Sequence, residues 1–113
     1  MENCTTHNFN VVPTTKGDVM VSGNYQSGIS VIDFTDLANP KEIAFADPAP
    51  LVDPNPPVGI ELGGDWSTYW YDGLIYESNI TTGMLVWNLS DKAVAGARKL
   101  RHLNPQTQEF TLG

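Results

Sequence analysis

The chain has 113 residues, of which 41% are hydrophobic, with ten Gly and eight Pro. This length suits one domain, the apolar content excludes a disordered tail, and the many Gly and Pro residues favour turn-rich β structure over helices. The formal net charge is -7, and no Lys or Arg occurs between Lys41 and Lys92. Because phosphate groups are bound by Lys and Arg, we expect neither nucleic acid nor anionic lipid as a partner.

The sequence lacks three further features: a membrane span, a signal peptide and a second cysteine. No apolar run approaches the roughly 18 residues that span a membrane, so we expect no membrane insertion. The first residues lack the basic and apolar regions of a signal peptide, so the signal of an exported parent protein would lie upstream. Cys4 is the only cysteine, which excludes an internal disulfide and a Cys-x-x-Cys motif.

Four short strands are predicted in the first 46 residues, at 7–12, 19–25, 29–34 and 41–46. The third strand has apolar side chains at both parities, with Ile29 on one side and Ile32 on the other, which predicts a sheet covered on both faces. Pro40 interrupts the ladder, and the charged start of the fourth strand places it at an outer edge.

The middle of the chain predicts a long loop. Residues 48–57 contain five prolines, and Gly59, Gly63 and Gly64 follow, so residues 47–65 are expected to form an insertion without strands. Such a loop is either a binding surface or a plain insertion over the sheet ends.

A second set of strands is predicted after this loop, at 66–71, 74–80, 84–89 and 97–103, with a weak further candidate at 109–112. Asp72 and Gly73 between the first two strands predict a type I′ hairpin.

One stretch of the first half recurs in the second. Residues 28–36 (GISVIDFTD) correspond to residues 83–91 (GMLVWNLSD), an offset of 55 (83 minus 28), and Asn24 lies over Asn79 at the same offset. The pattern indicates a tandem repeat of an antiparallel sheet. We therefore expect an all-β fold of two four-stranded sheets that are blades of a larger β-propeller, with a first blade at 1–46, the loop at 47–65, and a second blade with the C-terminal tail at 66–113.

Residues 28–40 (GISVIDFTDLANP) resemble the LVIVD repeat, whose pattern runs roughly G-G-L-x-V-x-D-V-S-D-P-x-N-P, with Leu37 where the family prefers Pro. Residues 69–73 (YWYDG) and the tail at 102–108 are similar to the last blade of such proteins, although Thr82 stands where they have Arg. The resemblance implies a bacterial or archaeal propeller protein that is extracellular, periplasmic or at the cell surface, of which these are the final two blades. It implies little about activity.

His7 and Asn8 are the first candidate site. By the same resemblance, a His that opens the innermost strand faces the central channel, where equivalents from other blades could converge on a metal or small ligand. The alternative is a His bonded to a neighbouring blade's backbone. One imidazole is not a metal site, because a metal needs three or four ligands. In the second copy this place holds Trp66, which could act as a stacking platform.

Two further groups were considered as sites. Asp65, with Glu61, Asp53 and Asp47, could gather Ca²⁺, but the spacing matches no known motif, so solvated charge is the expectation. Trp66, Tyr69, Trp70 and Tyr71 could form a carbohydrate-binding shelf or belong to the core between blades. The candidate ligand-binding residues are thus His7, Asn8, Asp65, Trp66 and Tyr69, and His7 is the only metal candidate.

We expect a non-catalytic propeller segment that serves as a binding or interaction scaffold and needs no cofactor. Its two uncovered apolar faces require partners, either the remaining blades of the same protein or other copies of the chain. One alternative is a propeller enzyme or metal site with His7 as a ligand. Another is a lectin-like ring of two-bladed chains.

Overall fold

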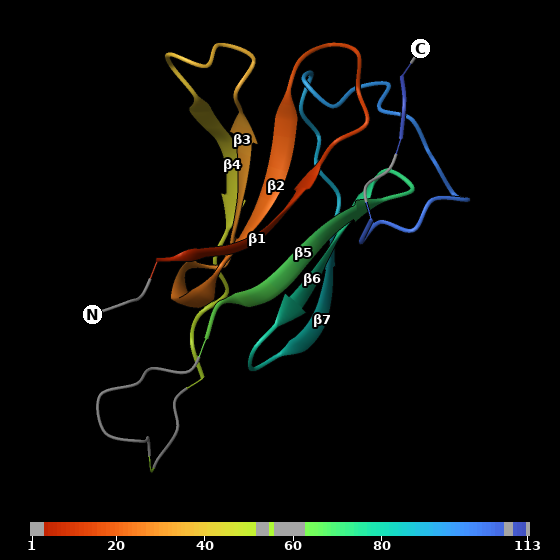
Figure 1. Ribbon diagram of the computed structural model, residues 1–113. Coiled ribbons are helices and arrows are strands. Elements are labelled where there is room, and N and C mark those ends of the chain that lie inside the picture. Colours follow the sequence, from red (N-terminus) through yellow and green to blue (C-terminus); the bar gives the residue numbers. More distant parts are fainter. Residues whose placement is uncertain (1–3, 52–54, 56–62, 108–109, 113) are drawn as a thin grey trace.

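The computed structural model describes residues 4–51, 55, 63–107 and 110–112, and this part of the chain forms two antiparallel sheets (Figure 1). The first sheet has the order β1-β2-β3-β4, and its strands are β1 (Thr6–Val11), β2 (Val19–Asn24), β3 (Ile29–Asp33) and β4 (Lys41–Ala46). A single 3₁₀ turn, η1 (Tyr25–Ser27), joins β2 to β3. The second sheet has the order β5-β6-β7, and its strands are β5 (Asp65–Tyr71), β6 (Leu74–Asn79) and β7 (Gly83–Trp87). The prediction of an all-β fold with two antiparallel sheets is confirmed.

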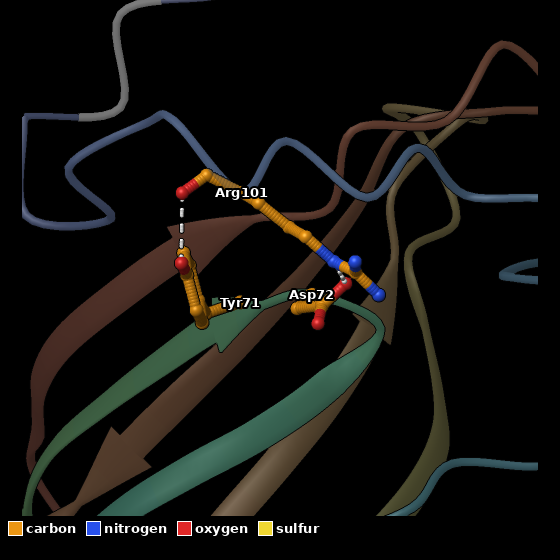
Figure 2. A network of polar contacts seen from close by, with 3 residues as sticks. All are labelled: Tyr71, Asp72 and Arg101. Atoms are coloured by element: carbon orange, nitrogen blue, oxygen red, sulfur yellow. Dashed lines mark hydrogen bonds and ion pairs between the residues drawn. The ribbon is translucent and has the colours of Figure 1, made fainter.

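The predicted fourth strand of the second sheet at 97–103 is wrong. Gly96 has a positive φ of 84°, and the chain then crosses the ends of β1 and β5 instead of running beside β7. The Arg98 N–H donates to the carbonyl of Pro13 at 2.8 Å. Figure 2 shows the next anchor, where the Tyr71 hydroxyl donates to the Arg101 carbonyl at 2.8 Å and Arg101 Nε donates to Asp72 Oδ1 at 2.9 Å. These bonds hold residues 98–101 against Pro13, Tyr71 and Asp72, so the segment does not pair with β7 as a fourth strand.

The weak candidate at 109–112 falls partly outside the described residues, since Glu109 is not described. Residues 110–112 are described and are not a strand. The Asp72-Gly73 hairpin is confirmed, because both residues have positive φ, 50° and 86°, as the central positions of a type I′ turn require.

The two sheets have the same ladder register. β1 pairs with β2 and β5 with β6, and the first strand of each sheet carries one extra residue near the end of the ladder: His7 in β1 and Trp66 in β5. Each bulge follows the corresponding pair of residues, because Thr6 lies opposite Asn24 and Asp65 lies opposite Asn79. His7 and Trp66 therefore occupy corresponding positions, as the predicted strand starts at 7 and 66 indicate.

The core lies between the sheets, where β1 and β2 pack against β5. Its buried residues are Val12, Val19, Val21, Ile29, Val31, Trp70, Ile75 and Val94. We expected each sheet to be covered on both faces. Within the described chain, each sheet has one covered face, which packs against the other sheet. On the outer faces, Phe45 of β4 and Met84 of β7 are each 73% exposed.

No helix of the described residues is long and apolar enough to cross a bilayer.

Candidate functional site

The two sheets meet through side chains of β1 that satisfy the free edge of β5. Asn8 Oδ1 accepts the Thr68 N–H at 3.1 Å, and Asn10 Oδ1 accepts the Trp70 N–H at 2.9 Å. Asn10 Nδ2 also donates to the carbonyl of Pro105 at 2.8 Å. Unpaired backbone N–H groups are costly when buried, so these two amides replace a missing neighbouring strand. The side-chain oxygen of Asn8, a predicted ligand-binding residue, is thus used within the protein.

An aromatic cluster of His7, Tyr25 and Trp66 lies where the two bulges meet. The His7 ring centroid is 4.8 Å from that of Tyr25 and 4.6 Å from that of Trp66, and the last two rings are 5.7 Å apart in an edge arrangement. Trp66 is 53% exposed and His7 is also exposed. The cluster is therefore a surface that a ligand can reach.

The His7 ring has a defined tautomer when neutral. Its Nδ1 lies 2.6 Å from the carbonyl oxygen of Trp66, and because a carbonyl only accepts, Nδ1 carries the proton that is donated. Nε2 is then the unprotonated nitrogen, which can accept a hydrogen bond or ligate a metal. The bond ties His7 to the backbone of the other sheet.

Gly64 allows this cluster to form. Its φ is +82°, and a Cβ there would collide with the carbonyl group of Tyr25. The backbone preceding β5 consequently packs directly on η1, which brings Tyr25 to the side of Trp66. A left-handed φ and this close approach both require glycine.

Two buried carboxylates lie behind the cluster. Asp65 has no exposed surface and Glu77 is 1% exposed. Asp65 accepts the Ser67 N–H at 2.9 Å and the hydroxyl of Thr68. The pKa of Asp65 is raised to about 7, first by burial and then by the nearby charge of Glu77, and the Ser67 and Ser78 N–H groups oppose this rise. The expectation of a solvated loop carboxylate is wrong for Asp65, because sheet one covers it.

Glu77 was not among the predicted site residues. Its carboxylate accepts Asn79 Nδ2 at 2.8 Å and Trp87 Nε1 at 2.6 Å. The available signal was its position two residues after Ile75, on the same face of β6 as a core residue. A carboxylate at such a position must be hydrogen-bonded, and this one is.

Searches of protein-family models, curated proteins and solved structures found no match to this chain. The site is accordingly interpreted from its own geometry.

Tyr69 does not join the aromatic cluster. It lies opposite Tyr76 in the ladder, on the face of sheet two that points away from sheet one. Trp70, its neighbour, is buried between the sheets, so these aromatic residues are divided between the two faces of the sheet and do not form one shelf. Of the loop carboxylates, Asp47 is exposed, while Asp53 and Glu61 lie outside the described residues.

Within the described ranges, no group of three or more His, Cys, Asp or Glu side chains lies close enough to hold a metal ion. The groups at the site are the Nε2 atom of His7, the rings of Tyr25 and Trp66, and the buried carboxylates of Asp65 and Glu77. These groups fit recognition by stacking and hydrogen bonding.

Proposed function

We propose that this chain is a non-catalytic β-propeller segment of a secreted or surface protein and serves as a binding scaffold whose outer faces take further sheets. The observation that supports this most is the outer face of sheet two. Tyr76 and Val86 are paired across β6 and β7 on that face, and Val86 is 47% exposed. Soluble proteins rarely leave such faces open, and the covering sheet would come from the same protein or another copy.

In this proposal, sheet two contacts a third sheet in the same way as sheet one contacts sheet two. Asn8 and Asn10 of β1 bond the edge of β5. The corresponding steps of β5 are Ser67 and Tyr69, on the face that no described strand covers. In this proposal they meet the inner strand of a third sheet, which agrees with the resemblance to propeller repeats.

Light scattering on the 113-residue chain tests the scaffold proposal. We expect self-association that rises with concentration, and we expect Val86→Lys on β7 to reduce it, because a charge in an apolar interface is costly. Leu37→Lys is the matched control, since Leu37 is exposed in a loop and away from both sheet faces. A wild-type chain that stays monomeric at high concentration, or equal effects of the two variants, would contradict the proposal.

The ligand-contacting surface of the scaffold is, in this proposal, the aromatic cluster. Exposed rings beside a hydrogen-bond acceptor suit the apolar face and hydroxyl groups of a sugar, and His7 Nε2 supplies the acceptor. Titration with soluble disaccharides, followed by the Trp66 indole NMR signal, tests this. We expect saturable shifts that are lost in His7→Ala. Shifts of the Trp87 signal instead would place binding elsewhere.

A metal site with His7 as one ligand is the second candidate, and the hydrogen bond from Nδ1 to a backbone carbonyl favours it, because metal-binding histidines are commonly oriented in this way. The other ligands would come from further sheets. Elemental analysis of the intact parent protein and of its His7→Ala variant distinguishes the two candidates. An unchanged metal content rules the metal site out.

A further inference from the structure

A hollow beside the loop at 89–97 has the features of a small-molecule site that is separate from the aromatic cluster. Its volume is about 540 Å³, within the roughly 300–1,000 Å³ typical of ligand pockets. One wall is Trp70, and the loop after β7 forms much of the rest. The loop at 89–97 takes no part in the scaffold proposal or in the aromatic cluster.

The Trp70 indole is the first observation. The side chain is 6% exposed, and its buried Nε1 makes no hydrogen bond to any of the described residues. The indole of Trp87, by contrast, donates to Glu77. Because the Trp70 Nε1 atom is buried, Trp70 contributes its ring to the wall of this hollow, and its N–H is not available to a ligand there.

Charge is the second observation. Lys92 and Lys99 both line the hollow, although the chain has only four lysines and a net charge of -7. Within the described part of the chain, neither lysine forms an ion pair. Asp91 also lines the hollow, and its carboxylate accepts the Ala93 N–H at 2.7 Å. At physiological salt, fields are screened beyond about 8 Å, so the local charges dominate, and the two lysines exceed the single carboxylate of Asp91.

The remaining lining is apolar. Leu89, Val94 and Ala97 contribute to it, and Val94 belongs to the buried core. A small inorganic anion would leave this surface in contact with water, whereas an organic anion would cover it.

We propose that this hollow binds a small amphipathic carboxylate. The carboxylate is bound by Lys92 and Lys99, and the apolar body packs on Leu89, Val94 and the Trp70 ring.

Indole NMR signals of the ¹⁵N-labelled 113-residue chain test the proposal with sodium benzoate as the probe and neutral benzamide as its comparison. We expect benzoate to shift the Trp70 signal saturably and to leave the Trp66 and Trp87 signals in place. Trp66→Phe and Trp87→Phe assign the three signals. We expect benzamide to bind about tenfold more weakly, because it lacks the charge-assisted bonds.

The lysines are tested in matched pairs. We expect Lys92→Gln with Lys99→Gln to weaken benzoate binding about tenfold or more, and Lys16→Gln with Lys41→Gln, which makes the same change in net charge away from the hollow, to alter it less than about twofold. These four positions are exposed, so folding is retained. The proposal is overturned by no saturable shift, by equal binding of benzamide, by equal effects of the two pairs, or by inorganic phosphate binding as tightly as benzoate.

Discussion

The two sheets pair their strands in the same way, but a group of three corresponding polar positions near the end of each ladder holds different side chains. In sheet one, the Thr6 and Ser22 hydroxyls donate to Asn24 Oδ1 at 3.2 and 3.0 Å, and Asn24 Nδ2 donates to Ser30 Oγ at 3.0 Å. In sheet two, the positions of Thr6, Ser22 and Asn24 hold Asp65, Glu77 and Asn79. One sheet thus has a neutral hydroxyl–amide network where the other has two carboxylates.

Burial at the first of these positions follows the cover that each sheet receives, while Ser22 and Asn24 are as buried as Glu77 and Asn79. Asp65 is fully buried because sheet one lies over it, whereas Thr6 at the corresponding step is exposed. The equivalent face of sheet one carries Phe9, which is 53% exposed. The local sequence therefore determines how the strands pair. The neighbouring sheet determines whether the polar groups at the first position are buried, and so determines the pKa of Asp65. The predictions below test that separation, from the largest expected effect to the smallest.

Asn10→Ala should have the largest effect on stability. It leaves the buried Trp70 N–H and the Pro105 carbonyl without their partners, which should lower the free energy of unfolding by about 3 kcal/mol. Tyr69→Phe, at the corresponding step of sheet two, should change it by less than about 0.5 kcal/mol. Urea denaturation measures both variants, and similar losses would show that the Asn10 contacts do not join the sheets.

Gly23→Ala should cost about 2 kcal/mol through overpacking. A Cβ at Gly23 would lie 2.5 Å from Asp65 Oδ2 and 3.0 Å from Thr68 Oγ1, so the carboxylate would have to move. Ser78 occupies the corresponding step of sheet two and is exposed, so Ser78→Ala should be within about 0.5 kcal/mol of wild type. Urea denaturation compares the two, and a neutral Gly23→Ala would mean that sheet one does not pack on Asp65.

Asp65→Asn should change the pH dependence of stability. Since the pKa of Asp65 is raised from 3.8 to about 7, the folded protein binds more protons than the unfolded chain between these pH values, and its stability falls as pH rises through this window. The variant should remove that fall. Denaturation midpoints between about pH 4 and pH 8 measure it.

Asp33 of sheet one provides the control of opposite sign. Hydrogen bonds from Thr35 lower the pKa of Asp33, so its contribution is present at neutral pH and is lost as pH falls into the acid range. Asp33→Asn should leave the slope between pH 4 and pH 7 as in wild type. If it abolishes that slope, or if Asp65→Asn retains it, the assignment to Asp65 is wrong.

Arg101→Gln should have the smallest effect. The side chain of Arg101 is 70% exposed and its ion pair with Asp72 is at the surface (Figure 2), so the loss should be below about 0.5 kcal/mol. The Tyr71 bond is to the Arg101 carbonyl and survives the substitution. Thermal unfolding at low and high salt measures the effect, and a loss above about 1 kcal/mol would mean that the tail is held by this ion pair.

The strands could be predicted because their signals are local. Short apolar runs between turns, the Asp72-Gly73 turn and the offset between residues 28–36 and 83–91 placed β1 to β7 close to their observed bounds. The strand at 97–103 failed because its competitor is distant in sequence. Pro13 and Tyr71 hold that segment across the strand ends, and no local pattern reports those bonds.

The site was predictable only where the two copies share a position. His7 and Trp66 begin the first predicted strand of each copy, and the two bulges bring them together. Tyr25 joins them through the η1 turn and its contact with Gly64, which depends on the path of the chain between the sheets. The burial of Asp65 and the role of Glu77 depend on the cover provided by sheet one, which a strand pattern does not contain.

Amide hydrogen exchange at Thr68 and Trp70 tests the central claim most directly, which is that side chains of β1 take the place of a neighbouring strand at the edge of β5. The account predicts that both amides exchange slowly in the wild-type chain, and that Asn8→Ala exposes Thr68 while Asn10→Ala exposes Trp70. Rapid exchange of both amides in the wild-type chain would contradict it.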